Sequence, residues 1–319
     1  MSVSNADTFL MSVRIGSAEP SAAGDSGSAS GRDACFKRNN GKSSAQKPLS
    51  TQLSAVVVEH DGTGRSAVHN LGQASVGIGK FVDQGSRVLA LYTGGTMGMK
   101  PDRNGRLAPV KGYLTEQIKE LLKQHEEEPL PRVEVQEWDE LLDSCDVGPD
   151  QWRKVALDIQ QRYEEVEGFV VIMGTDTMAY TASALSFMLE NLGKTVIITG
   201  SQVPFGRINS DARRNLLFAF ALACTLDIPE VCIVFDRVLL RGVRSRKEDS
   251  GSFAAFCSPF ISPLATLGLS VQVNTSLILP QPKGAFRVQD NMQTRVIVLK
   301  IVPSFDMLAL HRCSPLFEV

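Results

Sequence analysis

The chain has 319 residues, of which 43% are hydrophobic and 21% are charged, and its formal net charge is −2. This composition is typical of a globular protein with one large domain or two small ones, and the near-neutral charge indicates neither a nucleic-acid nor an acidic-membrane partner. No apolar stretch reaches the length of about eighteen residues that a membrane span needs.

The cysteines and histidines indicate a reducing compartment and no metal site. The six cysteines form no C-x-x-C pair. A chain of this length needs no disulfide staples, so we expect free thiols and a cytoplasmic location. The four histidines lack the spacing of zinc ligands. We therefore predict no metal ion in this protein.

Residues 1–85 differ in composition from the rest of the chain. The first half of this stretch is rich in Ser, Gly and Ala and has no apolar periodicity, so it cannot bury enough surface to offset the entropy of ordering. We expect residues 1–85 to be a disordered or poorly ordered N-terminal extension, with a short candidate strand at 53–60.

From Arg87 onward, strand and helix patterns alternate. Buried strands are predicted at 87–92, 168–174, 194–200 and 230–236. The stretch 131–138 alternates apolar and polar residues, as a half-exposed strand does. Helical spacing occurs in 110–124, 149–166, 177–193 and 210–228, with Ser210 as an N-cap and Gly193 at a C-terminal end. This succession predicts an α/β fold with a parallel or mixed sheet covered by helices on both faces.

In such a sheet a ligand lies beyond the carboxyl ends of the strands, so the segments that follow the buried strands should converge. These segments are TGGTMGM, TDTMAY, SQVPFGR and RVLLRGVRSRK. Thr96 and Thr175 stand in the first two of them. A threonine hydroxyl becomes a good nucleophile only when a neighbour takes its proton. A buried, neutral Lys247 suits that role, and Asp176 suits holding the lysine or binding a substrate ammonium group.

Residue chemistry alone leaves several alternatives open for these loops. A Gly-Gly pair after a strand is most often a plain turn. A glycine-rich loop also suits phosphate, although neither G-x-G-x-x-G after this strand nor a Walker pattern nor G-x-S-x-G occurs. The run RGVRSRKED, residues 241–249, has the composition of a solvated loop, in which Lys247 would be a surface lysine.

Two long motifs resemble those of the L-asparaginase family of threonine amidohydrolases. They are YTGGTMGM, residues 92–99, and VIMGTDTMAYTASALSFMLENLGKTVIITGSQVPF, residues 171–205. The resemblance is to the intracellular type I branch and to the asparaginase domain of animal asparaginase/lysophospholipase proteins. It implies an N-terminal catalytic domain over 86–275, then a linker and the truncated start of a smaller α/β domain over 276–319. Full-length members form homo-oligomers; the oligomeric state of this chain stays open.

The resemblance implies a role for each matching residue. Thr96 matches the nucleophile that attacks the side-chain amide carbon of the substrate. Thr175, Lys247 and Asp176 match a hydrogen-bonded triad, in which Asp176 also binds the substrate amino group. The implied reaction converts L-asparagine and water to L-aspartate and ammonia through a β-acyl-enzyme ester. It uses no metal and no organic cofactor.

The resemblance also implies how the substrate is held. Ser144 of LLDSCDV matches the serine that binds the α-carboxylate, and Gly95 and Gly174 offer backbone beside the substrate. The glycines before Thr96 are expected to let a loop close over a small amino acid, with backbone N–H groups near Thr96 stabilising the oxyanion. Thr93 is expected only to cap backbone.

Two departures from the family pattern bear on function. The bacterial family has a tyrosine that assists the nucleophile, and no tyrosine stands at the matching residues 105–107. The resemblance also implies that the chain carries only the start of the second domain. An alternative function is therefore a catalytically weak or inactive asparaginase-like binding module. Lysophospholipid hydrolysis is a third, supported by kinship alone. The preference between asparagine and glutamine stays open, because one methylene changes binding by only about 1–3 kcal/mol.

Overall fold

A computed structural model describes residues 59–60, 66–67, 74–76, 85–293, 296 and 303 of the chain, all within one compact unit. The predictions made for most of residues 1–84 and most of residues 294–319 lie outside these ranges. Of the candidate strand at 53–60, only the last two residues are described, and they form β1 (Glu59–His60), which pairs with β2 (Ser66–Ala67).

A mixed sheet of nine strands forms the centre of the described residues, in the order β3-β16-β15-β12-β11-β10-β8-β4-β7. Its parallel part comprises β11 (Val231–Phe235), β10 (Thr195–Thr199), β8 (Gly168–Ile172), β4 (Arg87–Gly94) and β7 (Arg132–Leu142). Its antiparallel part comprises β12 (Val238–Arg241), β15 (Ala265–Leu267), β16 (Val271–Val273) and β3 (Ala74–Val76). The predicted α/β fold with a parallel or mixed sheet is confirmed.

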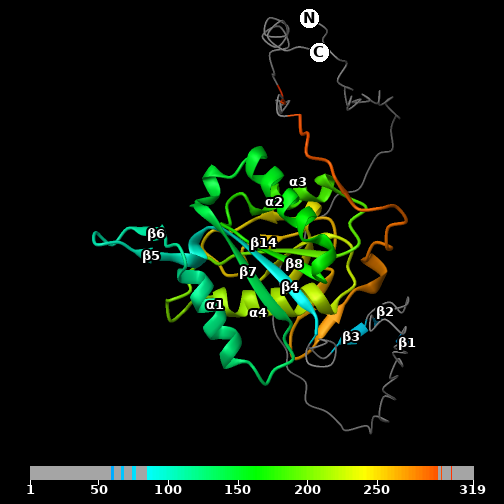
Figure 1. Ribbon diagram of the computed structural model, residues 1–319, viewed down its shortest axis with the longest axis horizontal. Helices are drawn as coiled ribbons and strands as arrows, with labels where there is room; N and C mark the ends of the chain where they lie inside the picture. Colours follow the sequence, from blue (N-terminus) through cyan, green and yellow to red (C-terminus); the bar gives the residue numbers. More distant parts are fainter. Residues whose placement is uncertain are drawn as a thin grey trace, which may run out of the picture. The chain divides into compact units, whose positions relative to one another are not determined.

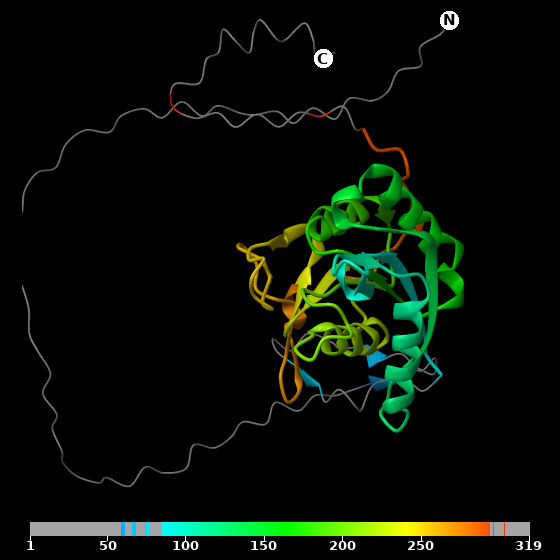
Figure 2. The same ribbon diagram turned by 90° about the vertical axis from the view of Figure 1, so that its left-hand side faces the viewer.

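Helices cover both faces of this sheet (Figures 1 and 2). One face carries α1 (Tyr113–Gln124) and α4 (Ala212–Thr225), and the other carries α2 (Pro149–Gln161) and α3 (Met178–Met188). The apolar run of strand β4 is continuous because its side chains pack alternately against the two helical layers. Val88, Ala90 and Tyr92 pack into the cluster with α1 and α4, whereas Leu89 and Leu91 pack into the cluster with α2 and α3. Each large apolar side chain among them contributes about 1.5–3 kcal/mol on full burial.

Short elements fill the connections. The remaining strands are β5 (Met99–Pro101), β6 (Leu107–Pro109), β9 (Leu189–Glu190), β13 (Arg246–Lys247), β14 (Phe256–Cys257) and β17 (Arg287–Val288). The 3-10 turns are η2 (Thr96–Gly98), η3 (Ser144–Asp146), η4 (Tyr163–Glu165), η5 (Gly242–Arg244) and η6 (Thr275–Leu277). The β5–β6 hairpin projects away from the sheet (Figure 1).

Several predicted helix limits differ from the structure. Gly193 does not end helix α3, which stops at Met188 because the next two residues, strand β9, pair with β17. The N-cap position of α4 is Asp211 rather than Ser210, although the Ser210 hydroxyl accepts a hydrogen bond from the Ala212 N–H. Helix α2 ends at Gln161, and a 3-10 turn replaces the rest of the predicted helix.

A buried ion pair fixes the segment that follows η6. The guanidinium of Arg241 binds both carboxylate oxygens of Glu230 and the Leu277 carbonyl. Glu230 also accepts a hydrogen bond of 3.0 Å from the Leu279 N–H. Both charged side chains are largely buried. The pair therefore joins strand β12, the start of β11 and residues 277–279.

The same segment continues along α2 and α3, where it is drawn in orange (Figures 1 and 2). Phe286 stacks on Tyr163 with 3.8 Å between the ring centroids. Arg287 of β17 binds Glu190 through two hydrogen bonds of 2.7 Å. This segment thus packs against the outer side of the helical layer that includes α3.

Candidate active site

Four neighbouring parallel strands deliver side chains to one edge of the sheet. In sheet order they are β7, β4, β8 and β10. Ser144 follows β7, Thr96 follows β4, Thr175 and Asp176 follow β8, and Gln202 follows β10. Because the carboxyl ends of adjacent parallel strands lie at the same edge, these residues occupy neighbouring loops. The predicted convergence of the loops after β4, β8 and β10 is observed.

The first three of these loops pack so closely that only glycine fits between them. A Cβ atom added to Gly94 would lie 2.1 Å from the Leu142 carbonyl oxygen. One added to Gly95 would lie 2.3 Å from the Gly174 nitrogen, and one added to Gly174 would lie 2.6 Å from the Ser144 Cβ. The two glycines before Thr96 also have φ angles of 131° and 87°, which disfavour any side chain. The TGG and GTD segments therefore nest backbone against backbone.

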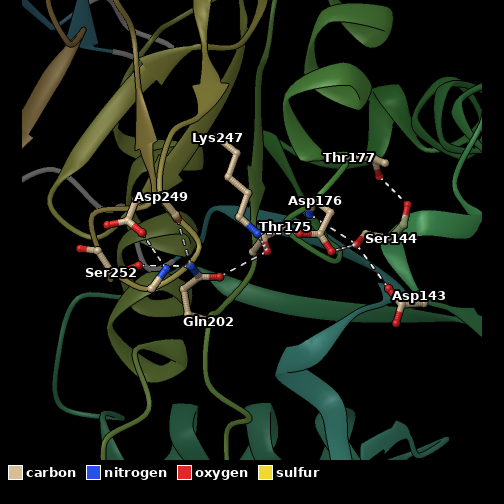
Figure 3. Close-up of polar contacts among 10 residues, drawn as sticks. Asp143, Ser144, Thr175, Asp176, Thr177, Gln202, Lys247, Asp249 and Ser252 are labelled. Atoms are coloured by element: carbon tan, nitrogen blue, oxygen red, sulfur yellow. Dashed lines mark hydrogen bonds and ion pairs between the residues drawn. The ribbon is translucent and has the colours of Figure 1, made fainter.

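Lys247, Thr175 and Asp176 form one hydrogen-bonded group (Figure 3). The Lys247 Nζ donates to Thr175 Oγ1 at 2.8 Å and to Asp176 Oδ1 at 2.6 Å. The Lys247 side chain is only 15% exposed, and Thr175 is buried. Lys247 is therefore not a solvated surface lysine, despite the charged run around it.

Lys247 reaches this group from strand β13, which follows the antiparallel strand β12 in the chain. Strand β12 runs antiparallel to β11, so the segment 237–247 does not simply extend the β11 loop. It continues through η5 and β13, both of which contact α3. Lys247 lies opposite the buried Phe256 in the β13–β14 pair. The hairpin of residues 246–257 therefore presents Lys247 to the loop after β8.

Ser144 and Asp176 are joined on the other side of this group. The buried Ser144 hydroxyl donates to Asp176 Oδ2 at 3.1 Å and accepts from the Asp176 N–H at 3.4 Å. The Thr177 hydroxyl donates to the Ser144 carbonyl at 2.7 Å (Figure 3). Hydrogen bonding from Lys247, and secondarily from Ser144, holds the pKa of Asp176 below its ordinary value. Asp176 is thus a stable carboxylate that faces solvent with its remaining surface.

Thr96 begins the 3-10 turn η2 and lies at the carboxyl end of β4. Within the described ranges, the structure does not join its hydroxyl directly to Lys247, whose ammonium group binds Thr175 and Asp176 instead. Its neighbour Gly95 contacts Gly174, the neighbour of Thr175. The Gly95 N–H itself donates to the Leu142 carbonyl at 2.9 Å. Thr93 donates to the Ile172 carbonyl at 3.3 Å, which confirms that it binds backbone.

Sequence reasoning assigned no role to Gln202, although it placed the segment SQVPFGR at this edge. Its side chain lies between Thr175 and the turn of the 246–257 hairpin (Figure 3). The only sequence signal is position, two residues beyond the buried segment predicted at 194–200.

Tyr113 is the nearest tyrosine downstream of Thr96. The Lys100 Nζ lies over its ring, 3.8 Å from the ring centroid.

Metal and membrane sites find no support in the part of the chain that the structure describes. No cluster of three His, Cys, Asp or Glu side chains there could hold a metal ion. No helix there has the length and apolar character of a membrane span. Cys145, Cys232 and Cys257 are free thiols.

Comparison with known proteins identifies the family. The family model described as "Asparaginase, N-terminal" matches residues 87–279. L-asparaginase 1 of Escherichia coli K12 is 40% identical over 223 residues, which are 70% of this chain and 65% of that protein. The 60 kDa lysophospholipase of Mus musculus is 42% identical over 238 residues, covering 68% of this chain and 42% of that protein. The chain thus spans less than two thirds of the length of these relatives.

Solved structures agree with this assignment. L-asparaginase I from Vibrio cholerae superposes with a TM-score of 0.65 at 40% identity, covering 72% of this chain and 68% of that one. The thermostable L-asparaginase from Thermococcus kodakarensis gives a TM-score of 0.63 at 28% identity, with the same coverage. The family model and both kinds of comparison lead to one conclusion: the chain belongs to the asparaginase family.

Proposed function

We propose that this protein hydrolyses L-asparagine to L-aspartate and ammonia through an acyl-enzyme formed on Thr96. The hydrogen-bonded group of Lys247, Thr175 and Asp176, beside the loop that carries Thr96, is the observation that supports this most. A binding module needs no such group. The family membership and the relatives named L-asparaginase favour the enzyme over an inactive module.

In the proposed reaction, the Thr96 hydroxyl attacks the side-chain amide carbon of asparagine, and its proton leaves to a base. The C–N bond then breaks, the leaving nitrogen takes a proton, and ammonia departs from a Thr96 ester. A water molecule beside the Thr175–Lys247 pair then adds to the ester carbonyl carbon, and the C–O bond to Thr96 breaks. The proton of the water passes to the Thr96 oxygen, which restores the hydroxyl and releases aspartate. The pair suits proton transfer because its 2.8 Å hydrogen bond is largely shielded from solvent.

The substrate backbone is held by the other side of the same group. Asp176, kept ionised by Lys247, is the proposed partner of the substrate ammonium group. Ser144 is adjacent and is the proposed partner of the α-carboxylate. Gly95 and Gly174 let these loops approach the substrate with bare backbone. Because the Gly95 N–H is bound to Leu142, the oxyanion donors must be other N–H groups near Thr96.

The cellular location and the oligomeric state of the protein are also proposals. The free thiols of Cys145, Cys232 and Cys257 support a cytoplasmic location, and the family resemblance supports a homo-oligomer of full-length members. No metal or organic cofactor enters the proposed reaction.

The test is ammonia release from L-asparagine by the 319-residue chain, its Thr96→Ala variant and its Thr96→Ser variant. We expect turnover by the parent chain, loss of turnover in Thr96→Ala and partial turnover in Thr96→Ser, which keeps a hydroxyl. Circular dichroism establishes that each protein is folded. Undiminished turnover in Thr96→Ala would refute the nucleophile, and a folded parent chain without turnover would refute the proposed activity.

A further inference from the structure

We propose that Gln202 is a positioning residue, which orients the Thr175 hydroxyl and ties it to the hairpin that carries Lys247. This inference rests on the proposed function for its catalytic consequence. The structural part, the tie between Thr175 and residues 246–257, stands on the hydrogen bonds of Gln202 alone.

The backbone of Gln202 is fixed by a buried carboxylate. The Gln202 N–H lies 3.1 Å from each oxygen of Asp211, and the Val203 N–H donates to Asp211 Oδ1 at 3.1 Å. The Asn215 amide donates to Asp211 at 3.2 Å and to the Gly200 carbonyl at 2.9 Å. Asp211 and Asn215 are both buried. The loop after β10 is therefore held in place from the start of helix α4.

The orientation of the Gln202 amide follows from its other partners. Its Nε2 faces two backbone carbonyls, at 3.2 Å from Ser252 and 3.4 Å from Asp249 (Figure 3). A carbonyl only accepts, so the NH2 end of the amide must point to the hairpin. The carbonyl end, Oε1, is then left facing Thr175 Oγ1 at 3.3 Å.

This orientation sets the direction of the Thr175 proton. Gln202 Oε1 can only accept, so the Thr175 hydroxyl donates toward Gln202. The oxygen lone pairs of Thr175 are then free for the 2.8 Å hydrogen bond from Lys247. The hydroxyl thus sits in a chain that runs from Lys247 through Thr175 to Gln202. Each hydrogen bond in such a chain polarises the next.

The same amide couples two parts of the site that are distant in sequence. Lys247 lies in β13, and Gln202 binds the turn of the same hairpin at residues 249 and 252. Loss of the amide should release the turn from the β10 loop while leaving the β13–β14 pairing intact. Gln202 is therefore expected to influence turnover through Thr175 and the hairpin, with no contact to substrate.

The test compares Gln202→Met, which has similar length and no amide, with Gln202→Glu, which keeps an acceptor for Thr175 but cannot donate to the two carbonyls. Gln124→Met, at an exposed position of helix α1, is the matched control. We expect Gln202→Met to lower kcat about tenfold with little change in KM, as loss of a hydrogen-bonded orienting group does. The solvent deuterium isotope effect on kcat should rise, a change that a smaller active fraction does not produce. Gln202→Glu should lose less kcat than Gln202→Met.

Hydrogen exchange of peptides covering residues 246–257 tests, without any catalytic assay, whether Gln202 holds this hairpin in place. Exchange should be faster in both Gln202 variants than in the parent and in Gln124→Met. Unchanged exchange in both variants overturns the proposal, and so does a rise in KM at constant kcat, which would mean substrate contact. If the folded parent releases no ammonia, the proposed function fails, while the exchange result still supports or overturns the tie. If Gln202→Met fails to fold, Gln202→Glu supplies the comparison.

Discussion

Gly95 and Gly174 are in backbone contact, and each directly precedes a threonine of the candidate site. A Cβ atom at Gly95 would lie 2.3 Å from the Gly174 nitrogen and 2.5 Å from its Cα. The distance between the loops of Thr96 and Thr175 is therefore set by the absence of two side chains. This contact explains the second glycine at the end of β4, and the contact of Gly94 with the Leu142 backbone explains the first.

Gly95→Ala should abolish turnover and destabilise the fold, because the methyl group meets backbone that cannot rotate away. Strain at positive φ and overpacking each cost about 1–3 kcal/mol. Gly105→Ala is a matched control, since Gly105 also has positive φ, 79°, but has open space around it. Urea unfolding and ammonia release of both variants measure the difference. Equal losses in the two variants would show that φ, and not the contact with Gly174, is responsible.

Lys247→Met should reduce turnover by at least about a hundredfold, because it removes the donor to Thr175 and leaves Asp176 without its cation. Lys111→Met is the control, since Lys111 forms a similar pair with Asp139 at 2.8 Å but on the open surface. That variant should keep full activity and change stability very little, because solvent screens an exposed ion pair. Steady-state kinetics on both variants give the comparison. Comparable turnover in the two would place Lys247 outside the reaction.

Ser144→Ala should raise KM for L-asparagine by about tenfold or more, the usual effect of losing a hydrogen bond to a charged group, and should change kcat much less. Alanine keeps the Cβ atom that packs against Gly174, so the loop should stay in place. Ser186→Ala, in which the lost hydroxyl binds only the Ala182 carbonyl of its own helix, is the control. A fall in kcat at constant KM would contradict the assignment of Ser144 to carboxylate binding.

Acid should remove the stabilising effect of Asp176 at a pH below its ordinary titration range. Its native pKa is lowered by the Lys247 hydrogen bond, so its contribution is fully present above the unfolded value of about 3.9 and is lost as pH falls through the lowered native value. The urea midpoints of the parent chain and Asp176→Asn, compared between about pH 7 and pH 2.5, should differ by a constant amount above about pH 4 and converge below it. A difference that widens on acidification would have the wrong sign.

Arg241→Met should destabilise the protein by about 3–5 kcal/mol, because it leaves the Glu230 carboxylate buried without a cation. The two side chains are only 14% and 5% exposed. Arg287→Met, which breaks the exposed pair with Glu190, should destabilise the protein far less, because solvent screens that pair. Denaturant unfolding of both variants tests this. Adding Glu230→Gln to Arg241→Met should recover part of the loss; no recovery would mean that the cost comes from packing.

Strands β4, β8, β10 and β11 were predictable because they are buried on both faces and so read as unbroken apolar runs, whereas the edge strand β7 was predictable from its alternation of apolar and polar residues. The antiparallel strands β15 and β16 were not predicted, since each has only three residues and no distinctive periodicity. The end of α3 was also beyond local reasoning. It depends on the pairing of Glu190 with Arg287, which is distant in the chain.

The candidate site shows the same division. The threonines after β4 and β8 were visible as polar residues at strand ends. Spacing alone could not decide the role of Lys247, because the surrounding charges favour a solvated loop, and its burial depends on strand β13 pairing with β14. Gln202 had no chemical signal at all. Its position matters because Asp211 fixes its backbone and two carbonyls orient its amide.

The division of strand β4 between two apolar clusters affects how the protein unfolds. Val88, Ala90 and Tyr92 complete one cluster, and Leu89 and Leu91 complete the other. Detaching either pair of helices would expose one side of this strand to water and weaken the support for the opposite layer. The two clusters should therefore melt together in a single cooperative transition, and any partly unfolded state that keeps one layer should be too costly to accumulate. The loop that carries Thr96 would then be lost only with the whole sheet.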